Sequence, residues 1–177
     1  LAVWLRGECV AELPRGSFHP SNIACAVASA LALGIDESIV WPALRKLTTV
    51  ESRAVTANTE NGLVVIDDTF NSNPVGAASA LRTLTRSVRE GRRVVVTPGM
   101  VEMGGLQYET NMHYAGQVAA APSDLVVVGW TNRRALLEGN PDAIAVGNRR
   151  EALRWVRENL RPGDGVLWEN DLPDHYP

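Results

Sequence analysis

The sequence lacks several features that would indicate a self-contained catalytic or phosphate-binding site. It has a single lysine, Lys46, and no GxxxxGK(S/T) segment, so these 177 residues contain no P-loop. No apolar run is followed by GxGxxG, which counts against a dinucleotide-dependent oxidoreductase. His19, His113 and His175 lack the spacing of metal ligands, and no Ser-His-Asp or Cys-His arrangement indicates a nucleophile.

Cysteines, basic charge and long apolar runs are also scarce. Cys9 and Cys25 lie far apart, so no disulfide framework is expected and a reducing cytoplasm is favoured. Cys25 belongs to an Ala-rich apolar stretch, where a buried, inert thiol is expected. The net charge of −3 provides no basic field for nucleic acid. No run approaches a membrane span and no signal peptide is evident.

Length and polarity suggest two parts of unequal size. A hydrophobic content of 45% in 177 residues is enough for one good core, or for one core plus a small appendage. Segment 48–60 is polar, rich in threonine and free of helical period, so a domain boundary is predicted near residue 50. The chain opens with Leu1, in mid-pattern, and is therefore expected to belong to a longer protein.

The first part is predicted to hold a hairpin and two helices. Residues 1–13 alternate roughly around a turn at 6–8, which indicates a short hairpin. A helix over 22–33 is apolar all round and is therefore expected to be buried. Asp36 is the predicted N-cap of a second helix over 37–46.

Beyond residue 60, short apolar strands alternate with helices. The predicted strands are 62–67, 93–97, 125–128, 144–146 and 165–168, and the predicted helices are 75–89, 108–121, 131–138 and 149–160. This alternation predicts an α/β fold, a Rossmann-like doubly wound sheet of mostly parallel strands. Because ligands bind at the carboxyl ends of such strands, a site is expected in the loops that follow them.

The segment VVIDDTFNSNP, residues 64–74, carries the strongest functional signal. An apolar strand ends in Asp67 and Asp68, at the place where an α/β sheet binds ligands. Two carboxylates there are suited to accept hydrogen bonds from ribose hydroxyls or to lie near a metal-phosphate centre. The structural alternative is capping of helix 75–89, but acids seven or eight residues ahead of the helix body lie too early for simple capping.

Two amides and one further acid complete the candidate residues. Asn73 precedes Pro74, which suits a first helical turn, so Asn73 is either an N-cap or a ligand contact. Asn71 lies too early to be the N-cap of the same helix, so a ligand contact explains it better than capping does. The loop TPGMVEMGG, residues 97–105, contains glycines that let backbone amides approach a ligand. Within that loop Glu102 either orients a partner or is solvated.

The acidic C-terminal segment LWENDLPDHYP follows the last predicted strand. It carries Glu169, Asp171 and Asp174 among prolines, a composition typical of a mobile chain end. Its position at the strand tips gives contact with a ligand as the alternative.

Taken in order, these elements resemble the C-terminal region of the Mur ligases, ATP-dependent amide-forming ligases of peptidoglycan precursor synthesis. The resemblance covers essentially the whole chain. It rests on Gly16 to Asn22 running into ACAVASALALGI, on Glu51-Ser52-Arg53, on DDTFNSNP at 67–74 and on Pro98 to Gly104. It implies that residues 1–49 end a central ATP-binding domain and that 50–177 form the Rossmann-like C-terminal domain.

The resemblance also implies roles for individual residues. Asn22 matches a residue near the adenine of ATP, and His19 stands where the family usually has another Asn. Arg53 matches an arginine that reaches the ATP phosphates, and Asp68 an acid that holds the ribose. Asn71 and Asn73, with Glu102, are the candidates for the acceptor substrate. This region would close over ATP and position an incoming amino acid or dipeptide, D-alanyl-D-alanine being favoured, for attack on an acyl phosphate.

The same resemblance places the catalytic groups outside this chain. A P-loop lysine, a carbamylated lysine and the Mg²⁺ ligands lie upstream in the family, in the central ATPase domain, so no catalytic or metal-binding residue is expected here. The partners implied are that domain and a UDP-linked peptide.

Two departures from the family's usual residues leave the identity of the acceptor substrate undecided. Gly99 stands where the family usually has Asp, and Glu169-Asn170-Asp171 replaces a Lys-Gly-Ser element. Replacing a cation by acids would change how an incoming carboxylate is held. A ligase that uses another amine and a non-catalytic Rossmann-like binding domain are the alternatives.

Overall fold

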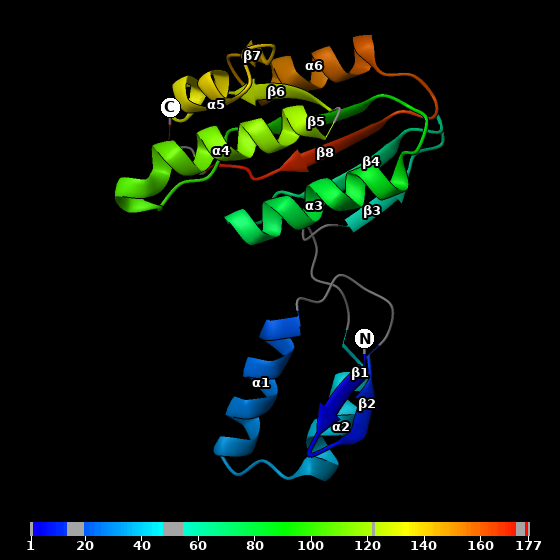
Figure 1. The fold of residues 1–177 in the computed structure, drawn as a ribbon. Coiled ribbons are helices and arrows are strands. Elements are labelled where there is room, and N and C mark those ends of the chain that lie inside the picture. The colour runs from blue at the N-terminus through cyan, green and yellow to red at the C-terminus, as the bar shows by residue number, and fades with distance from the viewer. Residues whose placement is uncertain (1, 14–19, 48–54, 122, 173–175, 177) are drawn as a thin grey trace. The chain divides into compact units, whose positions relative to one another are not determined.

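The structure is a computed structural model that describes residues 2–13, 20–47, 55–121, 123–172 and 176 (Figure 1). The chain forms two compact units, residues 1–51 and 52–177. Each unit has its own buried core.

The first unit contains the predicted hairpin and both predicted helices. Strands β1 (Ala2–Leu5) and β2 (Glu8–Glu12) pair antiparallel, and helices α1 (Pro20–Ala32) and α2 (Glu37–Arg45) follow. Asp36 caps α2 as predicted, because its Oδ1 accepts a hydrogen bond from the Ser38 amide at 2.8 Å.

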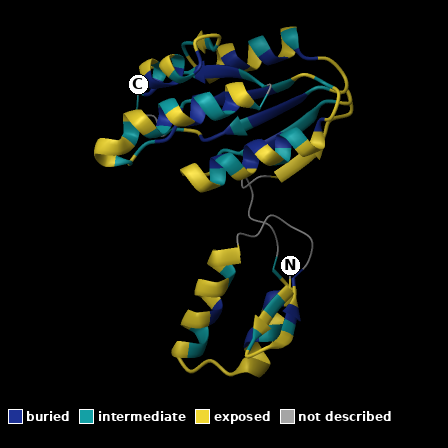
Figure 2. Ribbon diagram, viewed as in Figure 1, coloured by how far each residue is buried: buried dark blue, intermediate teal, exposed yellow. Residues whose placement is uncertain are grey.

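Helix α1 is far more exposed than its apolar sequence predicted. Val27 is its one buried residue, Leu33, one residue past its end, is 81% exposed, and Cys25 is exposed as well (Figure 2). The prediction of a buried helix with a buried thiol is therefore wrong for this unit. The reason is geometric, since a two-stranded hairpin and one short helix cannot surround a 13-residue helix.

The second unit is built on a six-stranded sheet. Its strands are β3 (Val55–Asn58), β4 (Val64–Asp68), β5 (Arg93–Thr97), β6 (Asp124–Val128), β7 (Ile144–Val146) and β8 (Gly165–Glu169). The strand order is β3-β4-β8-β5-β6-β7, and every neighbouring pair is parallel except β3 with β4. The predicted α/β fold with a mostly parallel sheet is confirmed.

Strand β3 was not predicted, since it lies in the polar segment 48–60. It pairs antiparallel with β4, and a tight turn that includes Gly62, with φ of +76°, connects the two. All four residues of β3 are exposed. An edge strand with both faces in solvent has no apolar alternation, which is the signal that predicts a strand.

Helices cover both faces of the sheet. Helices α3 (Pro74–Ser87), α4 (Gln107–Ala120) and α5 (Arg133–Gly139) pack on one face, and α6 (Arg149–Asn159) packs on the other. A short 3-10 turn, Gly104–Leu106, precedes α4. Each of these helices begins and ends within two residues of its predicted bounds.

Alternate residues of the central strands belong to two separate cores. Ile66, Val95 and Leu167 pack under α3 and α4, whereas Val94 and Val166 pack under α6. Because side chains alternate along a strand, these positions determine which face each strand-tip residue points to.

The larger core depends on Leu84, which is fully buried between α3 and the sheet. We expect Leu84→Ala to lower the free energy of unfolding by about 2–5 kcal/mol, because it removes packed methyl groups and leaves a cavity. Urea unfolding followed by circular dichroism measures this. Leu153→Ala on α6, where the side chain is 37% exposed, is the matched control and should cost less than about 1 kcal/mol. Equal losses in the two variants would contradict this account of the core.

Candidate functional site

Three polar side chains meet where β4, β5 and β8 end. Asp68, Thr97 and Glu169 each follow by two residues a strand residue that packs under α3 and α4. They therefore point to that same face of the sheet. Asp68 and Glu169 are also register partners in adjacent parallel strands, so two acids lie side by side at the carboxyl edge.

The Asp67-Asp68 doublet is divided between the two faces. Asp67 follows Val65, which packs against the core under α6. Its Oδ1 accepts hydrogen bonds from the Thr69 amide at 3.1 Å and from the Thr69 hydroxyl at 2.7 Å. Asp67 thus stabilises the start of the loop, and Asp68 is the acid of the pair that joins the polar cluster.

Glu169 is the centre of this cluster and is completely buried. The Ser72 hydroxyl donates to its Oε1, and the Thr97 hydroxyl donates to its Oε2 at 2.5 Å. Thr97 Oγ1 in turn accepts from the Gly99 amide at 2.9 Å. One carboxyl group therefore joins the loop after β4 to the loop after β5.

Asn170 adds two further links from the end of β8. Its side-chain amide donates to the Gly99 carbonyl at 2.6 Å, and its backbone amide donates to the Asp68 carbonyl at 3.1 Å. Asn170 has φ of +61°, a left-handed conformation that asparagine tolerates better than most residues. The three loops at the carboxyl edge are thereby fastened to one another.

Burial raises the pKa of Glu169 to about 7. The hydrogen bonds from Ser72 and Thr97 lower this pKa, and the negative charge of Asp68 raises it. Both forms of the carboxyl are therefore populated near neutral pH. The protonated form has a donor of its own, so one of the two hydroxyls must turn to accept from it.

Two buried asparagines hold the loop that begins at Pro98. Asn111 accepts from the Met100 amide at 2.8 Å and donates to the Met100 carbonyl at 2.9 Å. Asn132 donates to the Pro98 carbonyl at 3.0 Å. A Cβ on Gly99, whose φ is +82°, would lie 2.4 Å from Asn111 Oδ1. Glycine is therefore required here, which gives a physical reason for the unusual residue noted in the sequence.

The predicted acceptor residues have different surroundings. Asn71 is exposed, and its side-chain oxygen accepts from the Ser72 amide at 2.8 Å. Asn73 accepts from the Gly76 amide at 3.0 Å, so the predicted N-cap of α3 is confirmed. Glu102 is exposed, has φ of +62°, and its carboxylate has no polar partner among the described residues. Contact of any of the three with a substrate stays a prediction.

The predicted nucleotide residues are only partly described. Asp68 is half-buried at the end of β4. Asn22 is exposed on α1, in the first unit. His19 and Arg53 lie outside the described residues, and a site shared with Asp68 stays a prediction.

Glu169 and Asn170 were predicted in the C-terminal segment, with ligand contact as the alternative to a mobile chain end, but their structural role at the sheet edge was not predicted. The acidic C-terminal segment was expected to be mobile, and this is wrong for these two residues, which are buried at the sheet edge. The available signal was the strand itself. Side chains two residues apart on a strand point to the same face. Leu167 is an apolar strand residue, so Glu169, two positions later, would have been placed on the same buried face.

Neither a metal centre nor a membrane span is formed by the part of the chain that the structure describes. Within it, no three His, Cys, Asp or Glu side chains are grouped so as to hold a metal ion. Glu169 does not fit Mg²⁺, because it is buried and both its oxygens accept from hydroxyls. No helix in the described ranges is long and apolar enough to cross a membrane.

A mostly parallel sheet with polar groups gathered at its carboxyl edge defines the second unit as an α/β domain of the kind that binds ligands at that edge. Residues 52–169 match the family model described as Mur ligase, glutamate ligase domain. Since this match spans more than half of the chain, the chain belongs to the Mur ligase family.

Its relatives carry different acceptors in their names. The chain is 30% identical to UDP-N-acetylmuramoyl-tripeptide--D-alanyl-D-alanine ligase of Mycobacterium leprae, over 86% of this chain and 34% of that protein. It is 28% identical to UDP-N-acetylmuramoyl-L-alanyl-D-glutamate--2,6-diaminopimelate ligase of Chelativorans sp. strain BNC1, over 86% of this chain and 32% of that protein. It thus spans about a third of the length of the relatives it matches.

Solved structures show the same fold. The crystal structure of MurF from Acinetobacter baumannii superposes with a TM-score of 0.63 at 25% identity, over 85% of this chain and 33% of that chain.

The buried carboxyl of Glu169 should make stability depend on pH. The unfolded chain releases this proton near the ordinary pKa of 4.5, whereas the folded chain holds it up to about 7. The folded state therefore binds more protons in this window, and the free energy of unfolding falls as pH rises through it. Glu169→Gln removes this titration, because an amide of nearly the same shape has a donor and an acceptor side but stays neutral at every pH. We expect the stability of Glu169→Gln relative to the parent to rise between pH 4.5 and 7, by on the order of 3 kcal/mol.

Urea unfolding at several pH values measures this difference. Glu158→Gln, which alters an exposed carboxylate on α6, is the matched control and should follow the parent at every pH. A Glu169→Gln curve parallel to that of the parent would show that this carboxyl titrates alike in the folded and unfolded chain.

Proposed function

We propose that this chain is the C-terminal part of an ATP-dependent amide ligase of peptidoglycan precursor synthesis. The observation that carries the proposal is the placement of Asp68 at the carboxyl edge of a domain that belongs to the Mur ligase family. The two relatives match 86% of the chain, a larger share than residues 52–177 alone make up. This supports assigning residues 1–49 to the end of a central ATP-binding domain and residues 50–177 to the C-terminal domain.

In this proposal the chain closes over ATP, while most of the phosphate-binding groups belong to the upstream ATPase domain. Asp68 accepts hydrogen bonds from the ribose hydroxyls, and Asn22 and His19 lie near the adenine. Arg53 contributes a planar guanidinium that binds phosphate oxygens in pairs. ATP supplies the phosphoryl group that converts a substrate carboxylate into an acyl phosphate, and Mg²⁺ is held upstream of this chain.

The residues proposed to bind the incoming amine are those whose polar side chains are not already used to hold the fold. Asn73 is already engaged in capping α3, so Asn71 and Glu102, both exposed in the loops at the strand tips, are the stronger candidates for binding the incoming amine. The amine attacks the acyl phosphate, and the tetrahedral intermediate expels phosphate to leave an amide. We propose D-alanyl-D-alanine as the first acceptor to test, with diaminopimelate and single amino acids as alternatives, because the two relatives differ in this respect.

We further propose that the full-length ligase acts in the cytoplasm and that its other substrate is a UDP-linked peptide. The remaining chemistry, including transfer of the phosphoryl group, belongs to the central ATPase domain of the same protein. The 177-residue chain alone should therefore bind substrates without catalysing ligation.

The neighbouring acids Asp68 and Asp67 provide a matched test in the full-length enzyme. Asp68→Asn should raise the KM for ATP about tenfold or more, since a hydrogen bond to a charged group contributes about 1.5–3 kcal/mol. Asp67→Asn, which alters an acid that bonds to Thr69 on the other face, should change this KM by less than about threefold. ADP release with a UDP-linked peptide and a panel of amine acceptors measures both.

The outcomes separate the alternatives. A KM for ATP that is equally affected in both variants would remove Asp68 from the nucleotide site. ATP binding without ligation of any acceptor by the full-length protein would instead favour a non-catalytic binding domain. Activity with another amine alone would replace D-alanyl-D-alanine as the acceptor.

A further inference from the structure

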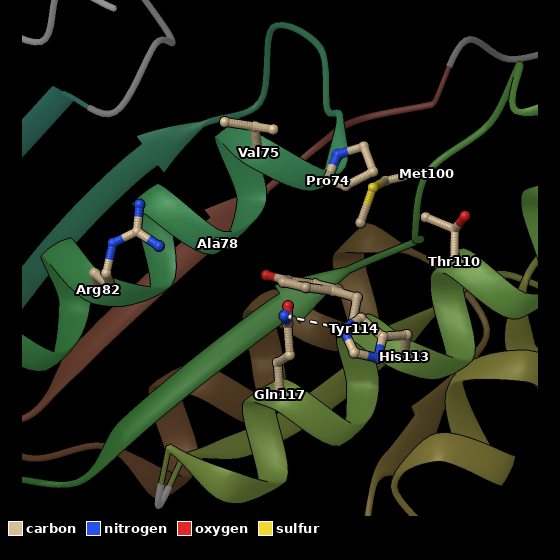
Figure 3. A pocket seen from close by; sticks show the side chains of 9 residues that line it. All are labelled: Pro74, Val75, Ala78, Arg82, Met100, Thr110, His113, Tyr114 and Gln117. Carbon is tan, nitrogen blue, oxygen red and sulfur yellow. Dashed lines mark hydrogen bonds between the residues drawn. The ribbon is translucent and has the colours of Figure 1, made fainter.

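A cavity of about 330 Å³ lies between α3 and α4, on the outer side of the helix layer (Figure 3). The residues that line it are spaced four apart along α3 and three or four apart along α4, so each helix contributes one face. The residues from α3 are Pro74, Val75, Ala78 and Arg82, and those from α4 include His113, Tyr114 and Gln117.

The cavity exists because a small side chain stands where the two helices face each other. Ala78 lies at the middle of the α3 face, opposite Tyr114, whose ring is almost completely buried. In Figure 3 the hydroxyl end of Tyr114 points from α4 toward α3. Met100, also fully buried, closes the cavity at the loop after β5. Its volume is at the small end of the range of about 300–1,000 Å³ typical of ligand pockets.

The polar groups around this apolar interior include one cation, that of Arg82. Arg82 is exposed, and its guanidinium makes no hydrogen bond or ion pair with any residue that the structure describes. Gln117 Nε2 lies 3.2 Å from His113 Nε2 at the same rim. The Tyr114 hydroxyl is buried and also has no hydrogen-bond partner among the described residues. A buried hydroxyl without a partner is unusual enough in a folded protein to require an explanation.

We propose that the α3–α4 cavity binds a small carboxylate with an apolar body. The apolar body lies against Val75, Ala78 and the Tyr114 ring, and the carboxylate lies at Arg82. An arginine is suited to this because its planar guanidinium pairs with both carboxylate oxygens. Other small anions lack the apolar body, and neutral apolar molecules lack the charge.

The centre of this site differs from that of the polar cluster at the strand tips, although Tyr114, which lines the cavity, interacts electrostatically with Glu169 and Asp68. Its charged group is eight residues along α3 from Pro74, whereas the cluster centres on Glu169. The two nevertheless share a boundary, because Pro74 follows the N-cap of α3 and Met100 belongs to the loop fastened by Asn111. A ligand in the cavity thus contacts Pro74, which directly follows the loop after β4, and Met100, which belongs to the loop after β5.

Binding of 4-phenylbutyrate to the 177-residue chain tests the proposal. We expect saturable shifts in the amide resonances of Ala78, His113 and Gln117 in two-dimensional NMR spectra. 4-Phenylbutanol, which has the same body without the charge, should bind about fivefold more weakly. Arg82→Gln should weaken 4-phenylbutyrate binding by a similar factor. Arg86→Gln, one turn further along α3 and outside the cavity, is the matched control and should leave the affinity unchanged.

A second variant separates loss of the site from loss of the fold. Ala78→Leu should fill the cavity and abolish binding while leaving the thermal unfolding midpoint equal to or above that of the parent. No saturable binding to the parent chain, equal effects of Arg82→Gln and Arg86→Gln, or unimpaired binding by Ala78→Leu would each overturn the proposal. Because binding is measured without ligation, the result is independent of the proposed enzymatic function.

Discussion

A single carboxyl group, that of Glu169, is the point at which the carboxyl edge of this sheet is held together. It lies at the end of β8, between β4 and β5, and is fully buried. It accepts one hydrogen bond from Ser72 in the loop after β4 and one from Thr97, the last residue of β5. A buried charge without partners would be strongly unfavourable. Ser72 and Thr97 must therefore stay in place, and the loops that carry them are ordered as a consequence.

The positions of the other candidate residues follow from this arrangement. Ser72 stands between Asn71 and Asn73, so fixing Ser72 also fixes where those two amides leave the sheet edge. Gly99, tied to Thr97 and Asn170, directs the loop that contains Glu102. Of the two neighbouring acids, Asp68 is the one that lies on the same face as Glu169. This agrees with the resemblance, which proposes Asp68 and not Asp67 for the ribose. In the proposed ligase this edge would receive substrates, while the phosphoryl transfer belongs to the central ATPase domain.

Much of the fold was predictable because local patterns and tertiary structure agree. The runs at 93–97 and 144–146 are strands with the predicted bounds, and Asp36 and Asn73 cap the helices that they precede. Strand β3 was not predicted because it is exposed on both faces and therefore has no apolar alternation. The exposure of α1 was not predicted because the burial of a helix depends on the elements that surround it. The role of Glu169 also escaped, since an acid next to prolines has the composition of a solvated tail. Its burial depends on partners 72 and 97 residues away, which no local pattern contains.

The protonation of Glu169 tests this account most directly. Carbon-13 NMR of the side-chain carboxyl in the labelled chain, assigned by its absence in Glu169→Gln, follows the titration at the atom concerned. The account predicts a midpoint at about pH 7 for this resonance. A midpoint near the ordinary 4.5, together with an unchanged midpoint in Ser72→Ala and Thr97→Val, would show a carboxylate that neither burial nor these hydroxyls affect and would contradict the buried link between the loops.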